Sequence, residues 1–216
     1  MNLERQILEA FSHRKIPVKV HKNEKDVLIR LRTAEKYENL TEIEFNTFLL
    51  NFNKFDWIMS GLLDHEFDAL YFKNRDWRGL TCAEFDEYSN AAYGFMPAAN
   101  CYYLAGVMSA SIRERITIKK TPLAPGKIIN TLVFSLDSML FDYSVKDTRL
   151  VEKFILLTPS ECTAVQEWLL WVAKEENDPD TYMKAYGNLE WLIREYDSPA
   201  FKKLRAIVQA ESSIDV

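Results

Sequence analysis

The stretch Asp64-His65-Glu66-Phe67-Asp68 places four ionisable side chains beside an apolar run, so it is the first place to look for chemistry. Asp64 and Asp68 share a helix face at i,i+4, and His65 has the chemistry of a general base or a metal ligand. Carboxylates at this spacing are more often a solvated helix face, where they repel each other slightly. A small helical enzyme with a carboxylate site at Asp64, Glu66 and Asp68, with or without a divalent cation, is therefore our alternative hypothesis.

Other catalytic signatures are missing from the sequence. Ser12-His13 and Ser109-Ala110-Ser111 offer hydroxyls, but no G-x-S-x-G motif accompanies them. Gly126-Lys127 lacks the upstream glycine of a P-loop, and there is no G-x-G-x-x-G. The three histidines and three scattered cysteines do not have the spacing of zinc ligands. We therefore predict no catalytic residue, no cofactor and no metal. The cysteines are expected to be reduced core residues: Cys82, Cys101 and Cys162.

The net charge of −5 is unevenly distributed along the chain. Residues 1–32 carry eight Lys/Arg against four Asp/Glu, whereas residues 33–90 carry five against twelve. The basic segment has the chemistry to touch phosphate, but a net acidic chain lacks the broad basic surface of a nucleic-acid binder. We expect the basic segment to be a solvated face that pairs with the acidic one.

The acidic segment 33–90 favours a non-enzymatic binding protein with a basic protein partner. Charge complementarity would accelerate their encounter, and an immunity or antitoxin-like protein that masks a toxin's basic active site is the most specific version. The predicted partner-binding residues are Asp64, Glu66, Asp68 and Glu84. The sequence does not define the oligomeric state.

The composition indicates a folded protein outside the membrane. Of the 216 residues, 48% are hydrophobic and 27% are charged, and no run approaches the roughly 18 apolar residues of a membrane span. The N-terminus lacks the apolar core and cleavage site of a secretory signal. We therefore expect a cytoplasmic protein with neither a membrane nor a nucleic acid as partner.

The N-terminal segment is predicted to form a short helix and a β-hairpin. Apolar residues at helical spacing over 3–14 indicate an amphipathic helix that ends before Pro17. Pro17 to His21 and Asp26 to Arg32 alternate like two short strands, with a polar turn between them.

The rest of the chain is predicted to be helical from its start signals. The clearest is Thr158-Pro159-Ser160-Glu161, in which threonine caps the helix, proline suits its first position and glutamate returns to the cap's amide. Thr41-x-x-Glu44 and Thr81-x-x-Glu84 have the same capping-box pattern. Prolines begin three further predicted helices: Pro97, Pro179 and Pro199. Residues 54–72 are expected to form core helices, and the five tryptophans are expected to be core residues.

Together these elements predict a mainly α fold, a multi-helix bundle in a single domain over residues 1–216 with a small N-terminal β-hairpin. An α+β fold is the second choice. The loop 119–126, with two prolines and a glycine, is the alternative domain boundary. Residues 128–134 fit either a helix or a strand.

Three motifs within residues 70–175 resemble an uncharacterised family of small, mainly helical bacterial proteins. They are Asp76-Trp77-x-x-Leu80, then Ala98-Ala99-Asn100-Cys101-Tyr102-Tyr103-Leu104, then Phe154-x-Leu156-Leu157-Thr158-Pro159-x4-Ala164-Val165-x2-Trp168-Leu169. In that family Pro and Ala typically follow Tyr-Tyr-Leu, whereas Ala105 and Gly106 follow here. The resemblance implies a bacterial origin and carries over no catalytic residue.

Overall fold

The computed structural model describes residues 2–33, 38–51, 63–120, 148–176 and 179–213 of the chain. Within these ranges the protein is mainly helical, which confirms the mainly α prediction. The elements are α1 (Leu3–Phe11), α2 (Glu24–Thr33), α3 (Glu42–Leu50), α5 (Asp64–Tyr71), the 3-10 turn η1 (Trp77–Gly79), α6 (Cys82–Glu87), α7 (Ala91–Gly94), α8 (Pro97–Lys120), α10 (Thr148–Phe154), α11 (Pro159–Glu176), α12 (Pro179–Glu195) and α13 (Pro199–Ser213).

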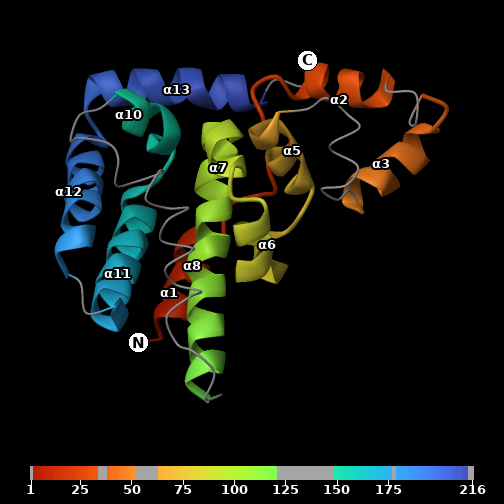
Figure 1. Ribbon diagram of the computed structural model, residues 1–216. Coiled ribbons are helices and arrows are strands. Elements are labelled where there is room, and N and C mark those ends of the chain that lie inside the picture. The colour runs from red at the N-terminus through yellow and green to blue at the C-terminus, as the bar shows by residue number, and fades with distance from the viewer. Residues whose placement is uncertain (1, 34–37, 52–62, 121–147, 177–178, 214–216) are drawn as a thin grey trace.

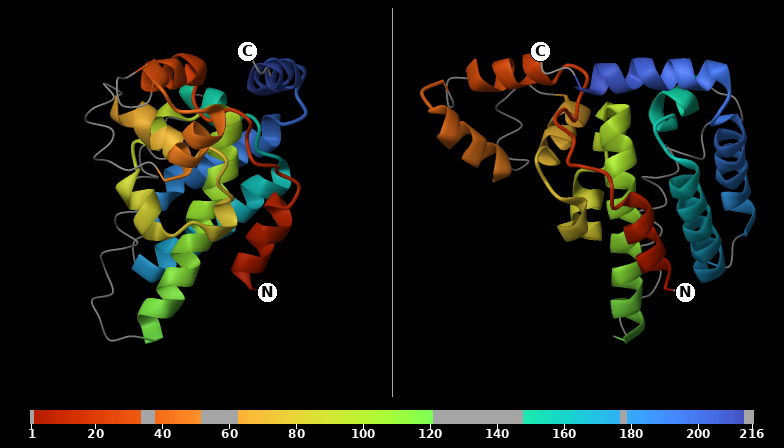
Figure 2. Two further views of the ribbon diagram at one scale, coloured as in Figure 1. Left: turned by 90° about the vertical axis from the view of Figure 1, so that its right-hand side faces the viewer. Right: turned by 180° about the vertical axis from the view of Figure 1, so that it is seen from behind.

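Helix α8 is the central element (Figure 1). It begins at Pro97, as predicted, and its 24 residues span about 36 Å. Every residue from 99 to 112 is buried, and burial on all sides is typical of a helix at the centre of a fold. Helices α1, α11 and α12 lie on one side of α8, and η1, α5, α6 and α7 lie on the other, with α2 and α3 outermost beyond α5 (Figure 2).

The predicted β-hairpin is wrong. Residues that were expected to form its second strand, Asp26 to Arg32, belong to α2, and the described ranges contain no strand. Val27 and Leu31 are fully buried one helical turn apart, while Ile29 is 51% exposed. The pattern that resembled strand alternation arises because Val27 and Leu31 lie on the buried face of the helix, whereas Ile29 lies between them in sequence on the exposed face. The segment before α2 contributes only one antiparallel bridge, between His21 and Phe95.

The predicted helix starts are confirmed where the sequence signals were local. Capping boxes form at Thr41 and Thr81. At the start of α11, the amide of Thr158 donates to Glu161 Oε2 at 2.7 Å, and the Glu161 amide donates to Thr158 Oγ1 at 3.3 Å. Each box satisfies backbone donors that would otherwise have no partner in the first helical turn.

The cysteine prediction is also confirmed, because all three are buried and free. Trp77, Trp168 and Trp191 lie in the core, whereas Trp171 is half-buried and Trp57 falls outside the described residues. Trp77 and Trp168 pack against α8, at Gly106 and Ser111, and Trp191 packs on Phe201 of α13.

Some predictions concern residues that the structure does not describe. They include residues 128–134, most of the loop 119–126 and the first part of the core-helix prediction for 54–72, whose second part is α5. The single domain over 1–216 stays a prediction. Among the described helices, none combines the length and the hydropathy needed to cross a bilayer.

Candidate binding groove

Two of the four carboxylates predicted to face a partner, Glu66 and Asp68, are buried. Glu66 is 5% exposed, and its Oε1 accepts from Arg30 Nη2 at 2.6 Å. Its Oε2 accepts from the Leu63 amide at 3.0 Å, at the start of α5. Burial raises the pKa of Glu66, but the hydrogen bonds from Leu63 and Arg30 outweigh it and lower the pKa below its ordinary value. Arg30 and Glu66 therefore form one of the expected pairs between the basic and acidic segments.

Two more of these carboxylates stabilise local structure. Asp68 is 2% exposed, and its Oδ2 accepts from both the amide and the side chain of Asn90 at 3.0 Å. Glu84 accepts from Thr81 in its capping box and from the Tyr71 hydroxyl at 2.7 Å. Only Asp64 of the four is exposed.

Of the four predicted partner-binding carboxylates, this arrangement leaves only Asp64 exposed, although other carboxylates of residues 33–90, among them Glu42, Glu44 and Glu87, are exposed. It also separates the carboxylates that the alternative hypothesis needs in one site, because Asp64, Glu66 and Asp68 have different environments. Within the described part of the chain, no group of three or more His, Cys, Asp or Glu side chains is placed to hold a metal ion.

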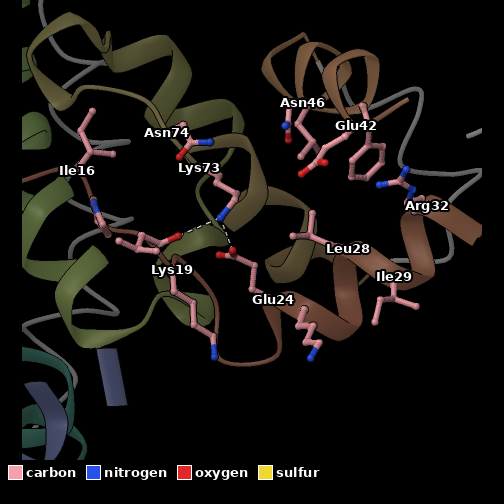
Figure 3. A pocket seen from close by; sticks show the side chains of 15 residues that line it. Ile16, Lys19, Glu24, Leu28, Ile29, Arg32, Glu42, Asn46, Lys73 and Asn74 are labelled. Carbon is pink, nitrogen blue, oxygen red and sulfur yellow. Dashed lines mark hydrogen bonds and ion pairs between the residues drawn. The ribbon is translucent and has the colours of Figure 1, made fainter. Parts of the chain in front are cut away.

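A depression lies between α2 and α3, and we call it the α2–α3 groove (Figure 3). Its volume is about 700 Å³. Side chains from α2, α3, the segment before α2 and the turn after α5 line it. The lining residues are Ile16, Pro17, Val18, Lys19, Glu24, Lys25, Leu28, Ile29, Arg32, Glu42, Phe45, Asn46, Leu49, Lys73 and Asn74.

The groove has an apolar floor and an apolar rim. Phe45 and Leu49 of α3 are buried, and Leu28 of α2 is half-buried against the core. Two rim residues expose large aliphatic surfaces, Val18 at 57% and Ile29 at 51%. Because removing apolar surface from water is favourable, covering these side chains would stabilise a complex.

The charged side chains of the groove are predominantly basic. Four Lys/Arg and two Glu line it. Lys73 pairs with Glu24 and donates to the Val18 carbonyl at 3.0 Å, so this charge is balanced within the protein. Lys19 and Lys25 have no ion pair among the described residues. The groove therefore keeps a positive balance in a chain whose net charge is negative.

Local structure determines where two of these cations lie. Asn74 has a φ of 62°, a left-handed conformation that asparagine tolerates, and it follows Lys73 in the turn that ends α5. Arg32 lies over the Phe45 ring at 5.5 Å and donates to the Leu40 carbonyl at 3.2 Å. The turn at Asn74 positions Lys73, and the contacts with Phe45 and Leu40 position Arg32. Both basic side chains thereby lie at the edge of the apolar floor (Figure 3).

Sequence reasoning assigned Lys19, Lys25 and Arg32 to a solvated hairpin face and missed the groove. The signal was the excess of Lys/Arg in residues 1–32 combined with the i,i+4 pair Val27 and Leu31, which marks a helix with a basic outer face. The apolar partner surface on α3 lies beyond this segment, so no local pattern would reveal it.

The motifs that carry the family resemblance are largely buried. Trp77, Asn100 and Trp168 are at most 1% exposed, and the Tyr103 hydroxyl donates to the Arg75 carbonyl at 3.2 Å. They report on packing around α8 rather than on a site.

Comparisons with protein-family models, with curated proteins and with solved structures each find no match to the chain. Membership of that family therefore stays a prediction.

Proposed function

We propose that the protein is a non-enzymatic binding protein that holds an acidic, amphipathic segment of a partner protein in the α2–α3 groove. The observation that carries this proposal is the placement of Lys19, Lys25 and Arg32 around an apolar floor. A helical segment laid into such a groove would bury its apolar side chains while its acidic side chains met the rim.

The size and charge of the groove support this kind of ligand. A volume of about 700 Å³ lies within the range of specific binding pockets, and the exposed aliphatic rim gives apolar area to bury. The unpaired cations favour a negatively charged segment and would increase its association rate.

This proposal reverses the sign of the partner expected from the sequence. The version with an acidic surface against a basic toxin needs Glu66, Asp68 and Glu84 to face outward, but Glu66 and Asp68 are buried and Glu84 already accepts from the Tyr71 hydroxyl. The basic groove offers accessible charges instead.

The test uses two labelled peptides of about 16 residues, each long enough for about four helical turns. Both carry leucines at i, i+3 and i+4; one has glutamates at the remaining positions and the other has lysines. Fluorescence anisotropy should show saturable binding of the glutamate peptide only, and binding should weaken as salt is raised. Equal binding of both peptides, or no saturation with the glutamate peptide, would reject the proposal.

Matched variants locate the binding surface. Lys25→Glu should weaken the glutamate peptide about tenfold, as expected when a cation that faces a ligand is reversed. Lys22→Glu makes the same charge change three residues earlier but outside the groove, so it should change affinity less than twofold. Similarly, Ile29→Ser on the rim should weaken binding, whereas Ile43→Ser, at an 80% exposed position outside the groove lining, should not.

A further inference from the structure

A second cavity lies where the segment after α1 meets the start of α8, the chain before α11 and the C-terminal part of α13. We call it the α1–α13 cavity; its volume is about 320 Å³. Four basic residues line it: His13, Arg14, Lys15 and Arg205. No Asp or Glu is among the described residues that line it. Such one-sided charge is unexpected in a chain with more acidic than basic residues.

The positive charge of Arg14 is balanced by the buried carboxylate of Glu161. Its guanidinium forms a two-pronged ion pair with Glu161, and Nη2 also donates to the Leu156 carbonyl at 2.7 Å. These bonds use Nε and Nη2 and leave Nη1 as a donor in a fixed orientation. Arg14 therefore contributes the donor Nη1 rather than net charge.

Arg205 and Lys15 contribute the net positive charge. Arg205 donates from Nε to the Ile155 carbonyl at 3.2 Å and from Nη2 to the Tyr196 carbonyl at 2.8 Å. Its guanidinium lies 3.7 Å from the centroid of the Tyr196 ring, so the side chain is held on two sides. Neither Arg205 nor Lys15 has a carboxylate partner within the described ranges.

Hydroxyl groups complete the lining. They belong to Tyr102, Thr158 and Ser212; the Ser212 hydroxyl donates to the Val208 carbonyl at 2.8 Å and the Tyr102 hydroxyl to Asp76 Oδ1 at 3.4 Å, so they add polarity to the cavity rather than free donors. The cavity holds about ten water-sized volumes of about 30 Å³ each, which is more than a single tetrahedral anion requires.

We propose that the α1–α13 cavity binds a small phosphate monoester. Two unbalanced cations match the dianionic phosphate, Nη1 of Arg14 and Nη1 of Arg205 are left as donors for its oxygens, and the remaining volume accommodates a small organic body. This site is separate from the α2–α3 groove, since Pro17 is the only residue that lines both.

The experiment titrates the full chain with ribose 5-phosphate, inorganic phosphate and ribose, and follows binding by calorimetry at low salt. Ribose 5-phosphate should bind most tightly, inorganic phosphate should bind more weakly, and ribose should not bind. Equal affinity of the two phosphates would show that the cavity takes the free ion and would overturn the monoester proposal. Absence of saturation with either phosphate would reject the site.

Variants separate this site from general surface charge. Lys15→Gln should weaken ribose 5-phosphate about tenfold, while Lys22→Gln, the same change outside the cavity, should leave affinity within twofold. Arg205→Lys keeps the positive charge but loses the planar guanidinium that the Ile155 and Tyr196 carbonyls hold in place, so it should also weaken binding of ribose 5-phosphate. Circular dichroism checks that this variant folds. Unchanged affinity in both Lys15→Gln and folded Arg205→Lys would overturn the assignment. The groove variant Lys25→Glu should bind ribose 5-phosphate normally, so the two proposals fail independently.

Discussion

The guanidinium of Arg14 and the carboxylate of Glu161 form a two-pronged ion pair that joins the segment after α1 to the first turn of α11. The Glu161 side chain is fully buried, and it also accepts from the Thr158 amide of its capping box. One carboxylate thus starts a helix and holds a segment that is 147 residues away in the chain.

We expect Arg14→Met to lower the free energy of unfolding by about 3–5 kcal/mol, because it leaves a buried carboxylate without its counter-charge. Urea unfolding followed by circular dichroism measures this change. Arg5→Met is the control: the Arg5–Glu9 pair is exposed on α1, and its loss should cost about 0–1 kcal/mol. Similar losses in both variants would contradict the role of Glu161 as a buried anchor.

Two helical glycines should respond to alanine with opposite signs. A Cβ added at Gly106 would lie 2.9 Å from Phe85 Cζ and 3.0 Å from Trp77 Cβ, whereas one added at Gly187 meets nothing within 4 Å. Gly106→Ala should therefore destabilise the protein by about 1–3 kcal/mol through overpacking between α8 and η1. Gly187→Ala should stabilise it by about 0.5–1 kcal/mol, because alanine is the better helix former. Stabilisation by both variants in thermal unfolding would show that η1 does not pack closely on α8.

The hydroxyl of Ser111 links α8 to α11. It accepts from Trp168 Nε1 at 2.9 Å and donates to the Met108 carbonyl at 2.7 Å. Ser111→Ala should cost about 1–3 kcal/mol, since the buried indole N–H loses its acceptor. The matched control is Ser109→Ala, because the Ser109 hydroxyl is buried without a hydrogen-bond partner among the described residues. Urea unfolding should show Ser109→Ala to be neutral or stabilising; equal losses in both variants would contradict the assignment.

His21 is a buried imidazole at the junction of α2, α5 and α7. It is 4% exposed, and its Nδ1 accepts from the Asn23 amide at 3.2 Å, so the bonded form has no proton on Nδ1. Burial lowers the pKa of His21 below its ordinary value. The charged or titratable groups that face it are Glu66, His65, Glu24 and Lys153.

A lowered pKa means that the unfolded chain binds a proton at a pH where the folded protein does not. The stabilising contribution is therefore present above the ordinary histidine pKa of about 6.5 and is lost as the pH falls below it. We expect the urea midpoint to fall between about pH 7.5 and pH 5.5. His21→Asn keeps an acceptor for the Asn23 amide but does not titrate, so it should reduce this fall. An unchanged pH dependence in the variant would assign it to other groups. The lowered pKa values of Glu66 and Glu84 act in a separate window, below about pH 4.5.

The sequence indicates some features of these helices and not the contacts of the same residues. It identified the capping box at Thr81 but assigned Glu84 to a partner, although the Tyr71 hydroxyl also occupies that carboxylate. It placed Asp64 and Asp68 on one helix face but did not distinguish the exposed residue from the buried one. The hydrogen-bond partner of Asp68, Asn90, is 22 residues away, and no pattern within one helix indicates it.

The sequence by itself determined where several helices begin, because a cap and its first turn interact within three or four residues. It also determined that α8 and the C-terminal helices bury large apolar faces. Only the tertiary structure decided that residues 24–33 form a helix, that Glu161 anchors Arg14, and that basic side chains of α2 line a groove with α3. These features depend on contacts between distant segments, since the same side chain is solvated or buried according to what packs against it.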